Sequence, residues 1–364
     1  VQMPTLDIEI RAQELGSGAP VLFIHGSPTS GAGFAPLLPH LPGVRSIVVD
    51  RPNCGLSGTP TRTRETAHRS ITHLLPDLLD ALELERASVV GSSLGGTVAL
   101  HGAVTVPQRI DRLVILGAPA AVEGLPLPTL DRLLLFPGVV GLAARFVPGR
   151  DGQRKALEGI GHSAAIAGGR IPDVYWDWYD RLLHDTGSWR DEFASYSAFA
   201  RWSMSYGPDV EVSIDELAGI ATPTQLVWGG LDSYGGRQAA DHMATVLPDA
   251  RLEFLPDAGH LPWLDDAAAV GSMIEGFLLD RDHDLVWARF GHGGFFDRDA
   301  HRALLGHGRS HHPVGLAHRV SSCQGSAIIA RTSRRHRFTG GAMRRSADCS
   351  SGVQMLLIAL RRRA

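Results

Sequence analysis

The sequence predicts an α/β fold with a largely parallel sheet flanked by helices, because short β-rich segments alternate with helical patterns from residue 6 to about residue 280. A chain of 364 residues with 44% hydrophobic content can build a globular core, which excludes a wholly disordered protein. The expected buried strands are residues 21–25, 46–50, 88–91, 113–117, 225–228 and 252–255. Residues 6–11 precede them and are expected to form an antiparallel edge strand.

Apolar residues at helical spacing predict helices between several of these strands. Leucine and isoleucine recur every three or four positions over residues 71–82, and Pro76 inside this pattern predicts a kink or a late helix start. A second helix is expected over 94–106, where Pro107 stops it, and a third over 264–279.

Residues 120–205 interrupt the alternation with a long insertion. They begin with Pro- and Leu-rich segments and then become aromatic, with Tyr175, Trp176, Trp178, Tyr179, Trp189, Phe193, Tyr196, Phe199 and Trp202. An insertion of this length rarely forms a bare loop. We interpret it as a helical lid over a pocket, inserted between a first core segment (1–119) and a second (206–282); a small additional core under a long connection is the alternative.

The C-terminal segment, residues 283–364, differs in composition from the rest. Residues 1–280 carry 20 basic and 33 acidic side chains, whereas residues 281–364 carry 15 arginines and 5 aspartates. Low apolar density with concentrated charge predicts a disordered Arg/His/Gly-rich extension. A non-native or read-through segment is the next interpretation. A nucleic-acid-binding arm is disfavoured, because arginines alone supply only salt-sensitive attraction to phosphates.

Cysteine content and hydropathy indicate the cellular compartment in which the protein is expected. Cys54, Cys323 and Cys349 form neither a disulfide framework nor a metal-binding spacing, and the histidines of the C-terminal segment have no ligand spacing. No run of 18 apolar residues exists, and the first residues lack the pattern of a secretory signal. We therefore expect a cytoplasmic protein that has no metal and no membrane association; the oligomeric state stays open.

The strongest chemical signal is the segment Gly91-Ser92-Ser93-Leu94-Gly95-Gly96. It follows a strand pattern and precedes a helical one, which is the context in which Gly-x-Ser-x-Gly forms a sharp, strained turn. The turn projects its central residue, Ser93, above the sheet edge at a helix N-terminus. Ser92 is not central in the motif and is excluded as the nucleophile.

A serine hydroxyl needs a base that is oriented by a third group. Asp232 follows the expected strand 225–228, and His260 follows the strand 252–255. Both therefore emerge at the same sheet edge as Ser93, in the order serine, acid, histidine. Asp257 and Glu123 are the alternative acids.

The segment His25-Gly26-Ser27-Pro28 follows the first buried strand. Gly26 permits a tight turn that aims backbone N–H groups at a pocket, so the N–H groups of Ser27 and Leu94 are the expected oxyanion hole. His25 is more often a hydrogen-bonding residue of such a turn than a reacting one.

Five ordered motifs now define a resemblance. The chain resembles the α/β-hydrolase superfamily, specifically its lidded serine hydrolases, over about residues 20–280; the motifs are His-Gly-Ser-Pro (25–28), Asp-Arg-Pro-Asn-Cys-Gly-Leu-Ser (50–57), Gly-Ser-Ser-Leu-Gly-Gly (91–96), Trp-Gly-Gly-Leu-Asp (228–232) and Gly-His-Leu-Pro-Trp (259–263). Family members usually have glycine where this chain has Asn53, and asparagine tolerates the left-handed conformation of that turn. Cys54 is expected to pack rather than react. Haloalkane dehalogenases and epoxide hydrolases are disfavoured, since they need a carboxylate where Ser93 stands.

The resemblance implies acyl transfer through Ser93, His260 and Asp232 without a cofactor. An apolar lid predicts a small hydrophobic ester as the substrate and the protein as a carboxylesterase; the expected substrate-binding residues are His25, Gly26, Trp176, Trp178, Trp202 and Leu261. A carbon–carbon bond hydrolase of ring-cleavage products is the first alternative and would need a basic group such as Arg190 or Arg201 at the pocket. Lactonase, thioesterase and perhydrolase activities share the same residues. A non-catalytic ligand receptor on a hydrolase scaffold is the alternative from another class.

Overall fold

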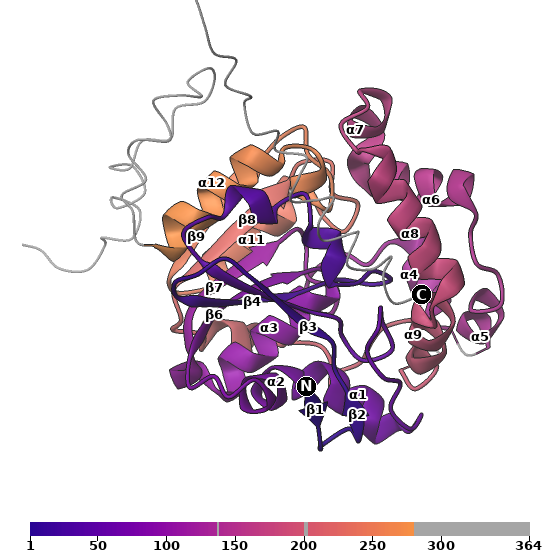
Figure 1. Ribbon diagram of the computed structural model, residues 1–364, viewed down its shortest axis with the longest axis horizontal. Helices are drawn as coiled ribbons and strands as arrows, with labels where there is room; N and C mark the ends of the chain where they lie inside the picture. Colours follow the sequence, from indigo (N-terminus) through magenta and orange to yellow (C-terminus); the bar gives the residue numbers. More distant parts are fainter. Residues whose placement is uncertain (137, 200–202, 280–364) are drawn as a thin grey trace, which may run out of the picture. The chain divides into compact units, whose positions relative to one another are not determined.

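The computed structural model describes residues 1–136, 138–199 and 203–279. A seven-stranded sheet forms the centre, with the strand order β3-β5-β4-β6-β7-β8-β9 (Figure 1). Only β3 runs antiparallel to its neighbour, and the other strands of this sheet pair in parallel. The strands of this sheet are β3 (Ala12–Leu15), β4 (Pro20–Ile24), β5 (Arg45–Val49), β6 (Ala87–Ser92), β7 (Ile110–Leu116), β8 (Thr224–Gly229) and β9 (Ala250–Leu255).

The six expected buried strands correspond to β4 through β9, which confirms the predicted α/β fold. The expected edge strand over residues 6–11 is wrong. In its place β1 (Gln2–Met3) and β2 (Ile8–Glu9) form a separate two-stranded sheet, and the edge of the main sheet is β3. Asp7 explains the difference, because its φ of 53° turns the chain where a continuous strand would have to be extended.

Helices cover both faces of the sheet, and side chains alternate between the two faces along each strand. On β4, Leu22 and Ile24 join one apolar cluster, whereas Val21 and Phe23 join the other. The first cluster packs against α1 (Arg64–Thr72), α2 (Leu74–Ala81), α3 (Leu94–Thr105), α10 (Ile214–Ala218) and α11 (Arg237–Val246). The second packs against α12 (Ala267–Leu278) and the short helices η1 (Gly31–Phe34) and η2 (Leu38–His40). The remaining short helices are η3 (Pro107–Arg109) and η5 (Pro262–Leu264).

The expected irregularity near Pro76 is present as two helices. The chain leaves helical geometry at His73 (φ −125°, ψ 6°), between α1 and α2. Pro76 lies in the first turn of α2, where a missing N–H costs no intrahelical hydrogen bond. The break places Leu75 against α3, because a β-carbon on Gly102 would meet the Leu75 side chain.

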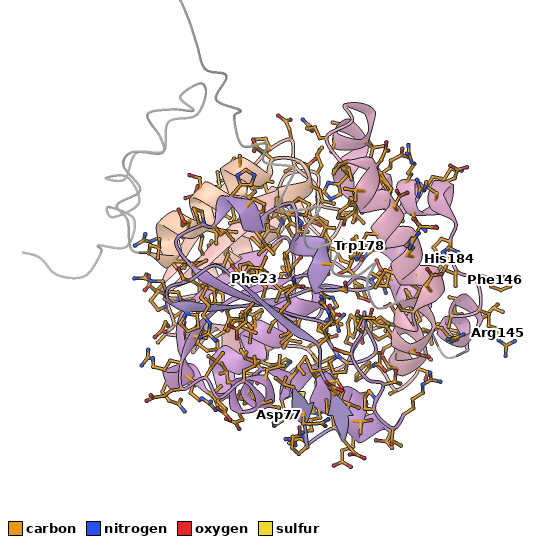
Figure 2. The ribbon with its side chains drawn as sticks, in the orientation of Figure 1. Phe23, Asp77, Arg145, Phe146, Trp178 and His184 are labelled. Carbon is orange, nitrogen blue, oxygen red and sulfur yellow. The ribbon has the colours of Figure 1, made fainter. Side chains whose placement is uncertain are left out.

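The long connection between β7 and β8 contains helices, as the interpretation of a helical insertion predicts. Those within residues 120–205 are α4 (Thr129–Leu134), α5 (Val139–Ala143), α6 (Arg150–Leu157), η4 (Glu158–His162), α7 (Ser163–Ala167), α8 (Asp173–Asp185) and α9 (Ser188–Tyr196), and α10 follows them before β8. Buried residues of α8, among them Tyr175 and Trp178, share the second apolar cluster with Phe23 and Phe34. Figure 2 labels Trp178 and Phe23 of this cluster. Phe146, after α5, is instead 69% exposed and points outward (Figure 2).

Three expectations lie outside the described residues: the predicted disorder of residues 283–364, the predicted substrate contact of Trp202 and the basic group that Arg201 would supply. Within the described ranges, no helix is both long enough and apolar enough to cross a membrane.

Candidate active site

Ser93 stands at the junction of β6 and α3 in a strained backbone conformation. Its φ of 52° and ψ of −121° lie outside the regions that non-glycine residues ordinarily occupy. A β-carbon on Gly91 would lie 2.5 Å from the carbonyl oxygen of Gly95, so the strand and the helix approach too closely for larger residues. The sequence motif therefore folds into the sharp turn that its spacing predicted, with the side chain of Ser93 at the helix N-terminus.

Asp232 and His260 follow adjacent strands and meet in the interior. His260 Nδ1 lies 2.9 Å from Asp232 Oδ2, and each residue is only 4% exposed. The backbone N–H of Ala118 donates to the same carboxylate oxygen at 2.9 Å, and the N–H of Tyr234 donates to Oδ1 at 2.9 Å. These bonds fix the carboxylate, so His260 Nδ1 carries the proton and Nε2 remains available as a base.

The ring of Tyr234 packs against the imidazole of His260. It stacks on the imidazole of His260, with centroids 4.4 Å apart and an interplanar angle of 26°. Burial raises the pKa of Asp131, on α4, and the hydroxyl of Tyr234 and the charge of His260 offset part of that rise. A carboxyl group of the insertion therefore interacts electrostatically with His260, which sequence analysis did not anticipate.

The two alternative acids have other surroundings. Glu123 is exposed, and its Oε2 accepts from the backbone N–H of Ile214 at 3.0 Å. Asp257 is also exposed. Neither replaces Asp232 beside His260 in this structure.

The turn after β4 lies directly against Ser93. A β-carbon on Gly26 would be 2.8 Å from Ser93 Cβ and 3.4 Å from Ser93 Oγ, so only glycine leaves room at this position. Leu94 is the first residue of α3, where backbone N–H groups have no intrahelical acceptor. Ser93 Oγ makes no hydrogen bond to His260 within the described part of the chain, and such bonds often shorten only when substrate is bound.

His25 occupies a structural position. Its Nε2 accepts from the backbone N–H of Arg51 at 2.8 Å, and its Nδ1 donates to the carbonyl of Gly26 at 2.7 Å. Burial, followed by the charge of Arg51, holds the pKa of His25 well below its usual value, so the ring is neutral. Both ring nitrogens bond within the turn, and the expected substrate contact of His25 stays a prediction.

A buried ion pair ties the same turn to the insertion. Arg51 pairs with Glu192 on α9, and Arg51 Nε also donates to the carbonyl of His25 at 2.8 Å. Glu192 further accepts from Cys54 Sγ at 3.2 Å and from the hydroxyl of Tyr196 at 3.3 Å. Burial, with the nearby Glu192 charge, raises the pKa of the Cys54 thiol, which therefore packs as a thiol, as predicted.

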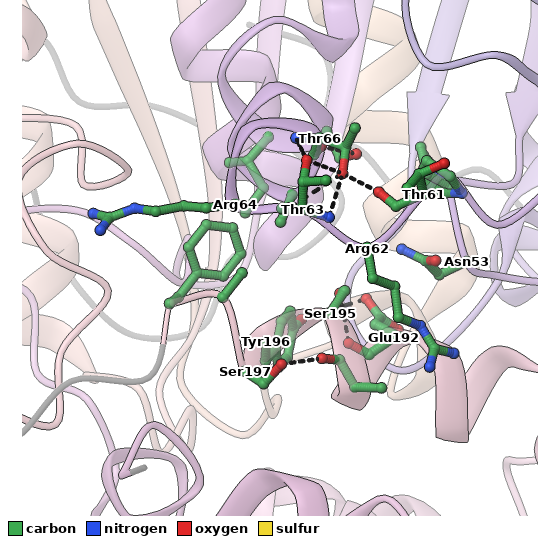
Figure 3. A pocket seen from close by; sticks show the side chains of 18 of the residues that line it. Asn53, Thr61, Arg62, Thr63, Arg64, Thr66, Glu192, Ser195, Tyr196 and Ser197 are labelled. Atoms are coloured by element: carbon green, nitrogen blue, oxygen red, sulfur yellow. Dashed lines mark hydrogen bonds between the residues drawn. The ribbon is translucent and has the colours of Figure 1, made fainter. Parts of the chain in front are cut away.

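A cavity of about 190 Å³ lies between the segment around α1 and helix α9 (Figure 3). Its walls include Arg51, Asn53, Leu94, Glu192 and Phe199. Leu94, which follows Ser93 in the chain, also lines it, whereas Ser93, Asp232 and His260 do not, and its lining is more polar than the predicted apolar pocket. Hydroxyl-bearing residues contribute much of that polarity: Thr61, Thr63, Thr66, Ser70, Ser195, Tyr196 and Ser197.

The expected substrate-binding aromatics lie elsewhere. Trp176 is 2% exposed and Trp178 is 7% exposed, and both pack within the second apolar cluster. Leu261 is 8% exposed, and its N–H donates to His162 Nε2 at 3.1 Å. None of the three lines the cavity. Sequence analysis also missed Arg51 and Glu192. The signal for Glu192 was the acidic pair Asp191–Glu192 among the aromatic residues of α9.

Comparison with known proteins agrees with this fold. The alpha/beta hydrolase family model matches residues 21–272, so the chain belongs to that family. A 2-hydroxymuconate semialdehyde hydrolase of Pseudomonas putida is 25% identical, with 77% of this chain and 97% of the relative covered.

Two solved structures have the same fold. A meta-cleavage product hydrolase from Pseudomonas fluorescens has a TM-score of 0.59 at 20% identity, covering 76% of this chain and 96% of its own. An enol-lactonase from Burkholderia xenovorans has a TM-score of 0.58 at 18% identity, covering 75% of this chain and 97% of its own.

Proposed function

We propose that this α/β hydrolase is a serine hydrolase that cleaves a carboxylic ester or a related acyl bond. The observation that carries the proposal is the buried His260–Asp232 hydrogen bond at 2.9 Å, located at the sheet edge where Ser93 forms its strained turn. A neutral imidazole oriented by a carboxylate is the base that a serine hydroxyl requires.

In this mechanism Ser93 Oγ forms a bond to the substrate carbonyl carbon while His260 Nε2 accepts the serine proton. The N–H groups of Ser27 and Leu94 stabilise the oxyanion of the tetrahedral intermediate. His260 then protonates the leaving alkoxide, and the acyl group remains on Ser93. Water attacks the acyl-enzyme and gives a proton to His260, which passes that proton to Ser93 Oγ as the bond to the acyl group breaks and the carboxylic acid leaves. Asp232 stabilises the imidazolium in both steps.

Carbon–carbon bond hydrolysis is the second candidate, supported by the named activity of the Pseudomonas putida relative. Such substrates are anionic and call for a basic group at the pocket. Arg190 does not fit this role, because its side chain is 71% exposed and lies 3.7 Å from Asp191. Arg201 lies outside the described residues. We further propose that the protein is a carboxylesterase for small hydrophobic esters and that it is cytoplasmic. Lactonase, thioesterase and perhydrolase activities would use the same residues.

The test compares hydrolysis of p-nitrophenyl esters of graded chain length with hydrolysis of a ring-cleavage dienoate. We expect measurable turnover of the esters, and a loss on the order of 10⁶-fold in Ser93→Ala. Ser92→Ala is the matched control and should keep its activity, since Ser92 is fully buried beside the turn. Turnover of the dienoate alone would favour the second candidate, and no turnover of either would favour a ligand receptor.

A further inference from the structure

The loop that carries His260 is bonded to the insertion through its backbone. The N–H of His260 itself donates to the carbonyl oxygen of Ile160 at 2.9 Å, and the N–H of Leu261 donates to His162 Nε2 at 3.1 Å. Both acceptors belong to η4, in the middle of the insertion, although His162 lies 99 positions before Leu261 in the chain. The base of the proposed reaction is therefore held by a distant segment.

A break in helical geometry shapes η4 for these contacts. Ile160 (φ −103°, ψ 19°) and Gly161 (φ 102°, ψ 7°) leave the helical region, which bends the chain and brings the Ile160 carbonyl to the neighbouring loop. A β-carbon on Gly161 would lie 2.4 Å from the carbonyl oxygen of Leu231, which precedes Asp232. It would also lie 2.8 Å from Gly259 Cα. The turn therefore contacts the loop of the acid as well as the loop of the base.

The imidazole of His162 is a buried acceptor with a defined tautomer. Its side chain is fully buried, and because the Leu261 N–H donates to Nε2, the ring proton is on Nδ1. Nδ1 lies 2.8 Å from Asp265 Oδ2, in electrostatic contact but not aligned for a hydrogen bond. The same oxygen accepts from the N–H of Gly259 at 2.9 Å. Asp265 therefore faces the ring and also holds the loop one residue before His260.

We propose that His162 is a positioning residue: by accepting from the Leu261 N–H, it holds the loop in which His260 lies. A buried N–H that loses its acceptor keeps the full cost of its desolvation, so the loop would leave this conformation to satisfy the group elsewhere. Because the N–H of His260 is bonded to the same turn, the base would move with the loop. The inference rests on the proposed function and adds that the insertion sets the position of the base.

The test replaces the imidazole by two amides that differ by one methylene group. In His162→Asn the amide ends near the position of Nδ1 and leaves the Leu261 N–H without an acceptor, whereas His162→Gln places a carbonyl oxygen near the position of Nε2. The substrate is the p-nitrophenyl ester of the chain length that the native protein cleaves fastest.

We expect kcat of His162→Asn to be about 10- to 100-fold below the native value with KM little changed, since a displacement of about 1 Å costs about 100-fold in rate. His162→Gln should recover most of this loss. A thermal melt of each variant checks that it is folded at the assay temperature.

A second pair of variants keeps the test decisive if the asparagine variant does not fold. Gly161→Ala should push η4 away from the Gly259 backbone and lower kcat in the same way. Gly159→Ala is its matched control in the same turn, because nothing lies within 4 Å of its β-carbon, and it should keep the native kcat.

Three results would overturn the inference while ester cleavage by the native protein upholds the proposed function. The first is a native kcat in folded His162→Asn, and the second is a loss in His162→Gln as large as that in His162→Asn. The third is an equal kcat in the two alanine variants.

If the native protein cleaves no ester, the proposed function fails and hydrogen–deuterium exchange decides whether His162 holds the loop. Mass spectrometry should show the amides of residues 259–261 exchanging about tenfold faster in His162→Asn than in the native protein, as expected for the loss of one neutral hydrogen bond. His162→Gln should exchange at close to the native rate. Equal exchange in the asparagine variant and the native protein would refute the inference.

Discussion

Gly117 shows how single residues near the end of β7 set the position of His260. Its φ is 68°, and a β-carbon there would collide with the carbonyl oxygen of His260 and lie 3.3 Å from Nδ1 of the same residue. A side chain at this position therefore both strains the backbone and displaces the imidazole from Asp232.

We expect Gly117→Ala to lower kcat for ester hydrolysis by about 100-fold, the effect of misplacing a reacting group by about 1 Å. Steady-state kinetics measure the effect of the displaced imidazole on turnover, and urea denaturation measures the effect of the strained backbone on stability. Gly141→Ala is the matched control, because nothing lies within 4 Å of its β-carbon and its place in α5 favours alanine. Equal kinetics of the two variants would contradict this role of Gly117.

Among single residues, the sequence predicts those whose role depends on a short motif of neighbouring residues. Ser93 is recognisable from its flanking glycines, and the left-handed turn at Asn53 from the motif around it. The Arg51–Glu192 pair is not predictable, since the two residues are 141 positions apart and burial alone does not identify a partner.

At the scale of elements, helix α9 is joined to the core turn by a buried ion pair. The side chains of Arg51 and Glu192 are 5% and 2% exposed. Removing one charge would leave the other buried and unpaired, which costs about 3–5 kcal/mol. The pair is therefore a constraint on how the insertion packs.

We expect Glu192→Gln to lower the free energy of unfolding by about 3–5 kcal/mol in urea denaturation. Asp111→Asn is the control, because Asp111 and Arg86 form an ion pair with side chains 45% and 53% exposed, worth at most about 1 kcal/mol. Similar losses in both variants would mean that the buried pair carries no special constraint.

The elements themselves were largely predictable, and the exceptions have physical causes. Short continuous apolar runs mark most of the parallel strands, since both faces of the sheet are covered. The edge strand was misplaced because Leu6, Ile8 and Ile10 alternate as a strand does and are indeed buried, but Asp7 turns the chain among them. Pairing with β5 then falls to residues 12–15, whose burial pattern is weaker.

At the scale of the whole molecule, buried histidines make stability depend on pH. Burial is the main cause that lowers the pKa of both His25 and His101 below 6.5. The unfolded chain then binds more protons than the folded one below pH 6.5, so the stabilisation is complete above that pH and is lost as the pH falls toward the lowered values.

We expect each of these histidines to contribute up to about 1.4 kcal/mol to the difference in unfolding free energy between pH 7.5 and pH 5.5. His101→Gln tests one of them, because glutamine can keep a donor toward the carbonyl of Val210, which His101 Nε2 contacts at 2.7 Å. Urea denaturation at both pH values should show a smaller difference in the variant. An equal difference in unfolding free energy between the two pH values in the native protein and the variant would show that His101 does not contribute to the pH dependence.

The central claim is that one serine, oriented by the turn after β6, is the nucleophile of this hydrolase. The most direct measurement is labelling of the full chain with a fluorophosphonate probe, followed by mass spectrometry of its peptides. The account predicts a single modified residue, Ser93, with labelling retained in Ser92→Ala and abolished in Ser93→Ala. No labelling of the native protein, or labelling that persists in Ser93→Ala, would contradict it.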